Sequence, residues 1–255
     1  MIRAMPVATL LLCASLGTAA PPAVAAEPTP AVIRVVTDDN YPPYVFRDAA
    51  GTLRGIVPDS WERWTATTGV RVELEAMDWS LAQRAMAAGN ADVIDMIFRT
   101  PARESVYEFT RPYADIDVAL FFRNEIGGIT DLSSARGFTV GAKDGDACIE
   151  TLARAGVDSV RAFPSYEDLV AQAARKHVSV FCMDVPPALY YLVRAGIAGE
   201  FRRTAPIYTG QFHRAVRKGA VPLLAGVQQG FDAIPAAEIA AIERKWQGTL
   251  LVPET

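Results

Sequence analysis

One order of elements occurs twice along the chain, and it restricts the fold more than any other feature. In each copy an apolar segment leads into a polar loop and a helix. A second helix then leads into an apolar segment with an aspartate near its end, Asp95 in the first copy and Asp184 in the second. Strands that alternate with helices form parallel β-α-β units. The sequence therefore predicts an α/β protein with two similar lobes, each presenting polar residues at its strand ends.

The elements of each copy follow from apolar runs and from cap residues. In the first copy we expect strands at 31–37, 70–74 and 91–98, and helices at 58–68 and 80–88. Ser80 is the expected N-cap of the second helix and Gly89 its end. In the second copy we expect strands at 137–142 and 178–183, and helices at 148–155 and 166–176. Ser165 and Asp168 resemble a capping box at the start of the last helix.

Two extended segments, 118–123 and 207–216, are expected to connect the lobes. Helices expected at 221–233 and 236–246 would pack on the first lobe, which is then discontinuous in sequence. The predicted division is a signal peptide at 1–26, lobe 1 at 27–120 and 210–255, and lobe 2 at 121–209.

The segment 91–113, ADVIDMIFRTPARESVYEFTRPY, carries the first chemical signal. A buried strand runs directly into a cluster with Arg99, Arg103 and Arg111. A guanidinium binds a carboxylate in a two-pronged way, and open α/β sheets bind ligands at the carboxyl ends of their strands. These arginines are candidates to hold an anionic group, and surface ion pairs are the plain alternative.

The candidates for a cationic group are acidic residues near strand ends, namely Asp95, Asp146 and Asp184. Tyr41, Tyr44 and Trp79 are candidates to cover the apolar part of a ligand. Because unpaired buried charges are costly, such a cleft favours a zwitterion or a small carboxylate. The alternative is that these charges pair with one another across the hinge.

The first residues form a targeting segment. Arg3 provides a positive n-region, an apolar stretch follows, and Ala23-Val24-Ala25 is an A-x-A cleavage pattern. The apolar stretch is too short to span a bilayer. We expect export to a bacterial periplasm. Cys13 fits a lipobox poorly because Leu12 precedes it. In that compartment Cys148 and Cys182 are free to form a disulfide or to remain buried thiols.

Composition and motifs exclude several functions. Apolar residues make up 51% of the chain, which is enough for a sizeable core, and the net charge of −4 with no basic stripe argues against nucleic acid. G-x-S-x-G, H-E-x-x-H and P-loop motifs are absent. Asp144-x-Asp146 fails as a calcium loop because Cys148 stands where an oxygen ligand is needed. The sequence predicts no metal, no cofactor and a binding protein rather than an enzyme.

Several motifs in order resemble the periplasmic solute-binding proteins of family 3, the polar amino-acid type, over almost the whole mature chain. They are DDNYPPYVF followed by G-x-L-x-G, the segment 91–113, LSSARGFTVGAKDG, VSVFCMDVPPALYYL and a final KWQG. The resemblance implies a two-lobe, type II periplasmic-binding-protein-like fold, each lobe a β-sheet flanked by helices, with the ligand cleft between them. It implies that Arg103 grips the α-carboxylate, that Asp184 grips the α-amino group, that Tyr41 stacks on the ligand, and that Asp146 and Ala147 add contacts.

The chain departs from this family where small hydroxyl or glycine residues normally precede the Thr-x-x-Arg. Those positions hold Asp95, Met96 and Phe98. The IFRTPAR and FCMDVPPALYYL versions look more like the Venus-flytrap sensor domains of bacterial histidine kinases and cyclic-dinucleotide enzymes. We expect a monomer that closes on an amino acid or small carboxylate at Tyr41, Asp95, Arg99, Arg103, Asp146 and Asp184.

The expected partner is a membrane permease of an ABC transporter or a membrane sensor. Two alternatives remain open at this point. One is an enzyme of the cyclohexadienyl dehydratase type, which resembles this family. The other is a ligand-free accessory module, with Met96 and Phe98 filling part of the cleft.

Overall fold

The computed structural model describes residues 31–247 together with Met1. The predicted signal peptide, with Cys13, and Gly248 of the last motif lie outside the described residues. Within the described part, no helix combines the length and the apolar character needed to cross a membrane.

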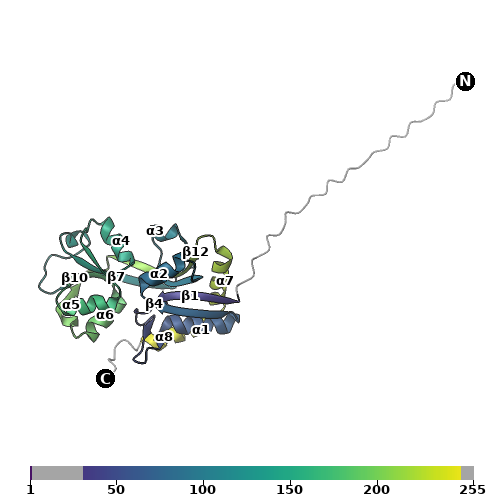
Figure 1. Ribbon diagram of the computed structural model, residues 1–255, viewed down its shortest axis with the longest axis horizontal. Coiled ribbons are helices and arrows are strands. Elements are labelled where there is room, and N and C mark those ends of the chain that lie inside the picture. The colour runs from purple at the N-terminus through teal and green to yellow at the C-terminus, as the bar shows by residue number, and fades with distance from the viewer. Residues whose placement is uncertain (2–30, 248–255) are drawn as a thin grey trace.

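The chain forms two α/β lobes side by side, joined by two long strands, β7 (Ala114–Arg123) and β12 (Tyr208–Arg217) (Figure 1). This is the predicted type II periplasmic-binding-protein-like architecture. The predicted crossings at 118–123 and 207–216 fall within these two strands or at their edge. The residue boundaries of the lobes remain a prediction.

The first lobe is built from the strands before β7 and from the helices at both ends of the chain. Its strands are β1 (Val32–Asp38), the short pair β2 (Phe46–Arg47) and β3 (Leu53–Arg54), β4 (Arg71–Met77), β5 (Val93–Phe98) and β6 (Tyr107–Phe109). Its helices are α1 (Ile56–Thr68), α2 (Trp79–Ala87), the short α3 (Pro101–Glu104), α7 (Val221–Asp232) and α8 (Ala236–Gln247).

The second lobe lies between β7 and β12 in sequence. Its strands are β8 (Val140–Lys143), β9 (Val160–Phe163), β10 (Val180–Asp184) and β11 (Phe201–Arg203). Its helices are α4 (Ala147–Arg154), α5 (Tyr166–Ala174) and α6 (Val185–Arg194), with 3₁₀ turns at Ser133–Ala135 and Ala198–Glu200.

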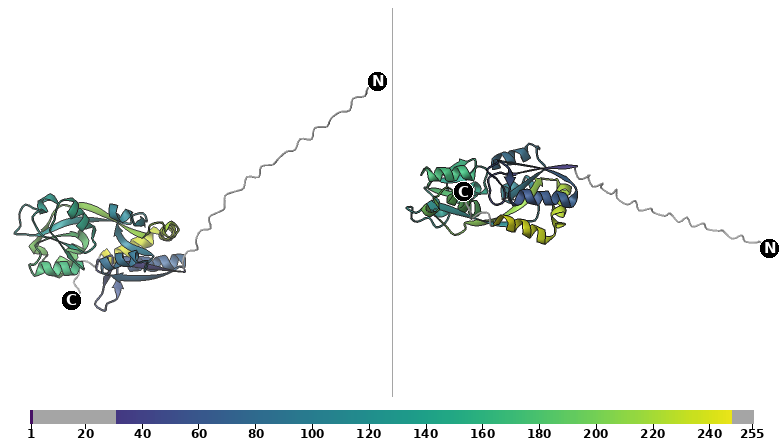
Figure 2. Two further views of the ribbon diagram at one scale, coloured as in Figure 1. Left: turned by 45° about the horizontal axis from the view of Figure 1, so that its top comes forward. Right: turned by 90° about the horizontal axis from the view of Figure 1, so that it is seen from below.

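One sheet runs through both lobes in the order β4-β1-β5-β12-β7-β10-β8-β9. The outer strands of each lobe pair in parallel, β4-β1-β5 in the first lobe and β10-β8-β9 in the second. The returning strand β12 is antiparallel to both β5 and β7. The last residues of β1, β8 and β10 line one cavity, as predicted for the polar strand ends. Figure 2 shows the arrangement of the two lobes from two further directions.

Two cap predictions had different outcomes. The Ser165 hydroxyl accepts a hydrogen bond from the Asp168 N–H, so the predicted cap of α5 is confirmed. The Ser80 cap is wrong, because α2 begins at Trp79 and Asp78 stands at its N-cap. The Trp79 ring is buried, and starting the helix one residue earlier places that ring against the core.

Cys148 and Cys182 form a disulfide with Cα atoms 6.3 Å apart, which decides between the two alternatives left open by the sequence. The bond ties the first turn of α4 to β10. Closing a loop of this length stabilises a fold by about 3–4 kcal/mol in the chain-entropy picture. It also fixes Asp146, at the start of α4, relative to Asp184, at the end of β10.

Candidate functional site

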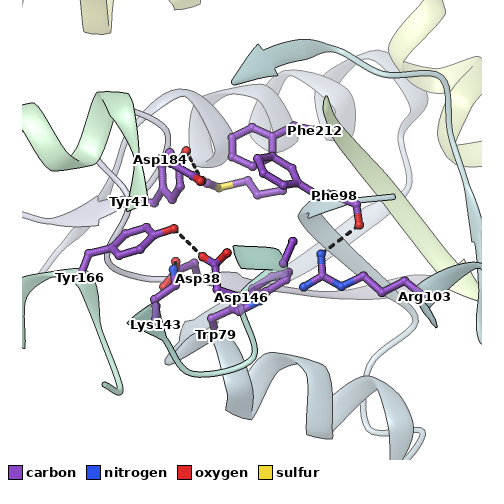
Figure 3. Close-up of a pocket in the computed structure, with 12 residues that line it drawn as sticks. Asp38, Tyr41, Trp79, Phe98, Arg103, Lys143, Asp146, Tyr166, Asp184 and Phe212 are labelled. Carbon is purple, nitrogen blue, oxygen red and sulfur yellow. Dashed lines mark hydrogen bonds and ion pairs between the residues drawn. The ribbon is translucent and has the colours of Figure 1, made fainter. Parts of the chain in front are cut away.

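A cavity lies between the lobes, lined by residues from both lobes and from the returning strand β12 (Figure 3). The first lobe contributes Asp38, Tyr41, Trp79, Met96, Phe98 and Arg103. The second contributes Lys143, Asp146, Ala147, Tyr166 and Asp184, and β12 contributes Phe212. Arg103 and Asp184 lie at opposite ends of this group of side chains in Figure 3.

Arg103 is held by backbone carbonyls rather than by an acid. Thr100 caps the short helix α3 by accepting a hydrogen bond from the Arg103 N–H, which places the side chain toward the cavity. Its Nη1 donates to the Phe98 carbonyl at 2.9 Å, and its Nη2 donates to the Gly145 carbonyl of the other lobe at 2.9 Å. A guanidinium has five N–H donors, so three remain for a ligand.

Two carboxylates of the second lobe face the opposite side of the cavity. Asp184 accepts a hydrogen bond from the Tyr41 hydroxyl at 2.7 Å, and Asp146 accepts one from the Tyr166 hydroxyl at 2.5 Å. The other oxygen of Asp184, Oδ1, is buried and has no hydrogen-bond partner. A buried carboxylate oxygen without a partner loses its hydration with nothing in return. A cationic group in the cavity would supply the missing donor.

The electrostatics of this carboxylate pair favour the uptake of positive charge. Burial, and then the negative charge of Asp146, raise the pKa of Asp184 to about 8. Burial likewise raises the pKa of Tyr41 and of Tyr166, so both phenols stay protonated and act as donors. At neutral pH Asp184 therefore holds a proton, which the ammonium group of a ligand can replace.

This raised pKa predicts how the stability of the ligand-free protein depends on pH. Between the unfolded pKa near 4 and the folded pKa of about 8, the folded state holds a proton that the unfolded chain has released. The contribution of Asp184 to stability is therefore greatest below this window and is lost as the pH rises through it. We expect the melting temperature to decrease from about pH 5 to about pH 9. Asp184→Asn, which does not titrate, should remove most of this slope, and an unchanged slope would contradict the assignment.

A buried ion pair between Lys143 and Asp38 closes the cavity from one side. Lys143 ends β8 in the second lobe and Asp38 ends β1 in the first, so the pair joins the lobes directly. The Lys143 ammonium also lies 3.9 Å from the centroid of the Tyr166 ring. This pair neutralises itself, which leaves the charges of Arg103, Asp146 and Asp184 for a ligand.

A second connection between the lobes converges on one carbonyl. The Gly145 oxygen accepts hydrogen bonds from Trp79 Nε1 at 3.0 Å, from Gln83 Nε2 at 3.1 Å and from Arg103 Nη2. Gly145 has a φ of +71°, which glycine adopts without the strain that another side chain would meet. The three donors belong to the first lobe and the acceptor to the second, so they hold the lobes closed.

The closed cavity is small. Its volume is about 30 Å³, whereas a water molecule needs about 10–15 Å³ on this scale and ligand pockets measure about 300–1,000 Å³. Met96 and Phe98 occupy part of the space between the lobes. Entry of a ligand larger than one or two water molecules therefore requires the lobes to separate, which breaks the contacts at Gly145 and Lys143.

The structure brings four of the six predicted site residues together. Tyr41, Arg103, Asp146 and Asp184 all line the cavity. Arg99 does not: it pairs with Glu104 and lines a neighbouring pocket, which shares Phe98 and Ala147 with this cavity.

Asp95 is also placed elsewhere, inside the first lobe and fully buried. It accepts hydrogen bonds from Trp61 Nε1 and from the Tyr113 hydroxyl, each at 2.7 Å. It also forms an ion pair with Arg214 at 3.3 Å. All of its partners are intramolecular, so its position gives no support to the predicted contact with a ligand. The Arg99–Glu104 contact is a surface ion pair, the alternative given above for these arginines.

Four residues that line the cavity were not predicted from the sequence as site residues. Asp38 and Lys143 are the last residues of β1 and β8, at positions that the sequence assigned to polar loops, and Tyr166 lies within the predicted helix cap. Their signal was present, since both residues stand where a predicted strand ends. Phe212 comes from the returning strand, and no local pattern marks its approach to Tyr41, with ring centroids 5.2 Å apart.

Comparison with solved structures places this geometry among two-lobe binding proteins. A histidine kinase sensor domain with similarity to periplasmic binding proteins is 25% identical, with a TM-score of 0.79, covering 85% of this chain and 96% of that one. An ancestral arginine-binding protein bound to glutamine is 23% identical, with a TM-score of 0.76, covering 86% of this chain and 99% of that one. The BvgS periplasmic domain of B. pertussis is 21% identical, with a TM-score of 0.71, covering 86% of this chain and 43% of that one.

The sequence family gives the same result. No curated protein sequence matches the chain. The model of the bacterial extracellular solute-binding proteins, family 3, matches residues 33–249, which contain both lobes and every cavity residue named above. The chain therefore belongs to family 3 of the bacterial extracellular solute-binding proteins.

Proposed function

We propose that the protein binds an amino acid or a similar small zwitterion in the cleft between its lobes. Arg103 holds the carboxylate, Asp184 and Asp146 hold the ammonium group, and Tyr41 covers the ligand. The observation that carries the proposal is the buried, unpartnered Oδ1 of Asp184 at the far end of the cavity from Arg103. A ligand with a cation at one end and an anion at the other satisfies both groups.

Binding would be coupled to opening and closing of the lobes. The long strand β12 pairs with β5 and β6 of the first lobe, and β7 pairs with β10 and β11 of the second. Because β7 and β12 also pair with each other, they are the natural hinge. In the proposed cycle, a ligand replaces the direct contacts at Gly145 with its own contacts to both lobes. The protein would act as an exported monomer that reports the solute to a permease or to a membrane sensor.

The test is the melting temperature of the purified protein against a panel of amino acids and small carboxylates. A ligand at a hundredfold excess over its dissociation constant adds about 2.7 kcal/mol of stability. For a chain of this size that corresponds to a shift of several degrees, at about 2–4 °C per kcal/mol. Shifts with zwitterions that shrink in Asp184→Asn support the proposal, and zwitterion shifts of the same size in Asp184→Asn contradict the role of that residue.

One observation favours a second function, catalysis in the same cleft. A carboxyl group with a pKa of about 8 is protonated at neutral pH and can act as a general acid. Enzymes of the cyclohexadienyl dehydratase type would use such an acid in a decarboxylating dehydration. Turnover of prephenate or arogenate decides this alternative. If neither is consumed and no small ligand shifts the melting temperature, the self-filled cavity instead indicates an accessory module.

A further inference from the structure

A second cavity lies in the first lobe, away from the cleft. Its volume is about 330 Å³, within the range of small-molecule pockets. The helices α1, α7 and α8 contribute to its walls, together with the segment leading into β7. None of its lining residues belongs to the inter-lobe cavity.

A buried arginine lines this cavity without a complete set of partners. Arg214, on β12, is 8% exposed. Its Nε lies 3.3 Å from Asp95 Oδ2, but this nitrogen is sealed and makes no hydrogen bond. Among the described residues, the terminal nitrogens Nη1 and Nη2 of Arg214 donate no hydrogen bond, and unlike Nε they keep some accessible surface. A buried guanidinium with free donors is costly unless a further acceptor is supplied.

The surroundings fix the plane in which those donors point. The guanidinium carbon lies 3.3 Å from the centroid of the Phe231 ring and 4.3 Å from that of Tyr113. Rings that stack on a guanidinium occupy its faces and leave its in-plane N–H groups for hydrogen bonds. The Nε edge faces Asp95, so the terminal nitrogens are the edge available to the cavity.

The ion pair with Asp95 leaves the terminal N–H groups of Arg214 available for another acceptor. The carboxylate already accepts hydrogen bonds from Trp61, from Tyr113 and from the Met96 N–H at 2.6 Å. Three donors stabilise a carboxylate strongly without any ion pair. A second anion on the free edge of the guanidinium would therefore be bound by a cation that is preorganised and largely desolvated.

We propose that this cavity is a second ligand site, which takes a small organic carboxylate with an apolar body. The carboxylate binds two-pronged to the terminal nitrogens of Arg214, with Ser60 as a further donor on the cavity wall. Val57 and Ile239 provide apolar walls for the body of the ligand. Glu243 also lines the cavity and repels an anion, which directs the carboxylate toward Arg214. The proposal does not depend on the function assigned to the cleft.

The four indole N–H groups of the protein form a natural set of reporters. Trp61 donates to Asp95 next to the proposed site, whereas Trp79 donates to Gly145 in the cleft. Trp64 donates to the Val227 carbonyl, and Trp246 donates to Asp59. In a two-dimensional ¹H–¹⁵N NMR titration of the full protein with benzoate, the Trp61 indole signal should move and the Trp79 signal should not. Benzyl alcohol, which has the same ring and no charge, should move neither.

Two variants localise the binding. Arg214→Gln should weaken benzoate binding about tenfold or more, the loss typical of hydrogen bonds to a charged group. Because this change also leaves Asp95 without its cation, Ile239→Phe provides a second test that keeps the ion pair and fills the cavity. Ala241→Phe, which places the same ring at an exposed position on the same helix, is the control and should bind benzoate normally.

The results of the benzoate titration test the proposed second site and do not test the cleft. Trp61 shifts that are lost in Ile239→Phe and kept in Ala241→Phe support it. Benzoate that moves Trp79, that binds Ile239→Phe as tightly as the parent protein, or that causes no shift at millimolar concentration overturns it. An amino acid that moves only Trp79 reports on the cleft and leaves the benzoate result to stand by itself.

Discussion

Replacing Asp95 with alanine is expected to lower the free energy of unfolding by about 3–5 kcal/mol, the cost of leaving one member of a buried ion pair without its partner. Asp95 is 0% exposed, and its Oδ2 lies 3.3 Å from the Arg214 guanidinium. The change also removes the acceptor of the Trp61 and Tyr113 hydrogen bonds. Chemical denaturation of the variant and of the parent protein measures the loss.

The matched control for Asp95 removes both charges. Asp95→Ala combined with Arg214→Met should recover part of the stability, since a thioether chain of similar length fills the space without needing a partner. A double variant as unstable as the sum of the two single variants would mean that the residues do not act as a pair. A loss below about 1 kcal/mol in Asp95→Ala would show that solvent from the neighbouring cavity already screens Arg214.

Replacing Arg103 with alanine is expected to weaken binding of the cleft ligand by about 30-fold to several thousand-fold. The reason is that removing one partner of a desolvated charge pair typically costs about 2–5 kcal/mol of binding free energy. Arg103 is 6% exposed, and two backbone carbonyls fix its guanidinium at the cavity wall. Calorimetric titration with the ligand found in the melting screen measures the change.

Arg99 provides the matched control for Arg103. Both arginines follow β5 within five residues, but Arg99 is exposed and pairs with Glu104. Arg99→Ala should leave the affinity within about twofold of the parent value, as expected for an exposed ion pair. If Arg99→Ala and Arg103→Ala lose the same affinity, the loss comes from the general charge of the segment and not from a contact in the cleft.

The sequence predicted the parts of the fold that depend on local pattern. The alternation of strands and helices, the cap at Ser165 and the two long crossings all follow from apolar periodicity and from cap chemistry over a few residues. The strand ends also predicted Arg103, Asp146 and Asp184, because parallel strands place their carboxyl ends along one edge. Ser80 was misassigned because the burial of Trp79 decides where α2 begins, and burial depends on the packed core.

Only the three-dimensional packing decided which charged side chains are paired inside the protein and which remain available to a ligand. Asp95 and Asp184 occupy matching places in the repeated pattern, yet Asp95 meets Arg214 from a strand more than one hundred residues later in the chain, while Asp184 keeps a bare oxygen at the cavity. Lys143 and Asp38 likewise form their ion pair between two different lobes, so neither local sequence predicts it. Local sequence sets the position of a side chain along its own element. Whether that side chain is satisfied depends on which distant element packs against it, so the fold class can be predicted from local pattern and the composition of the site cannot.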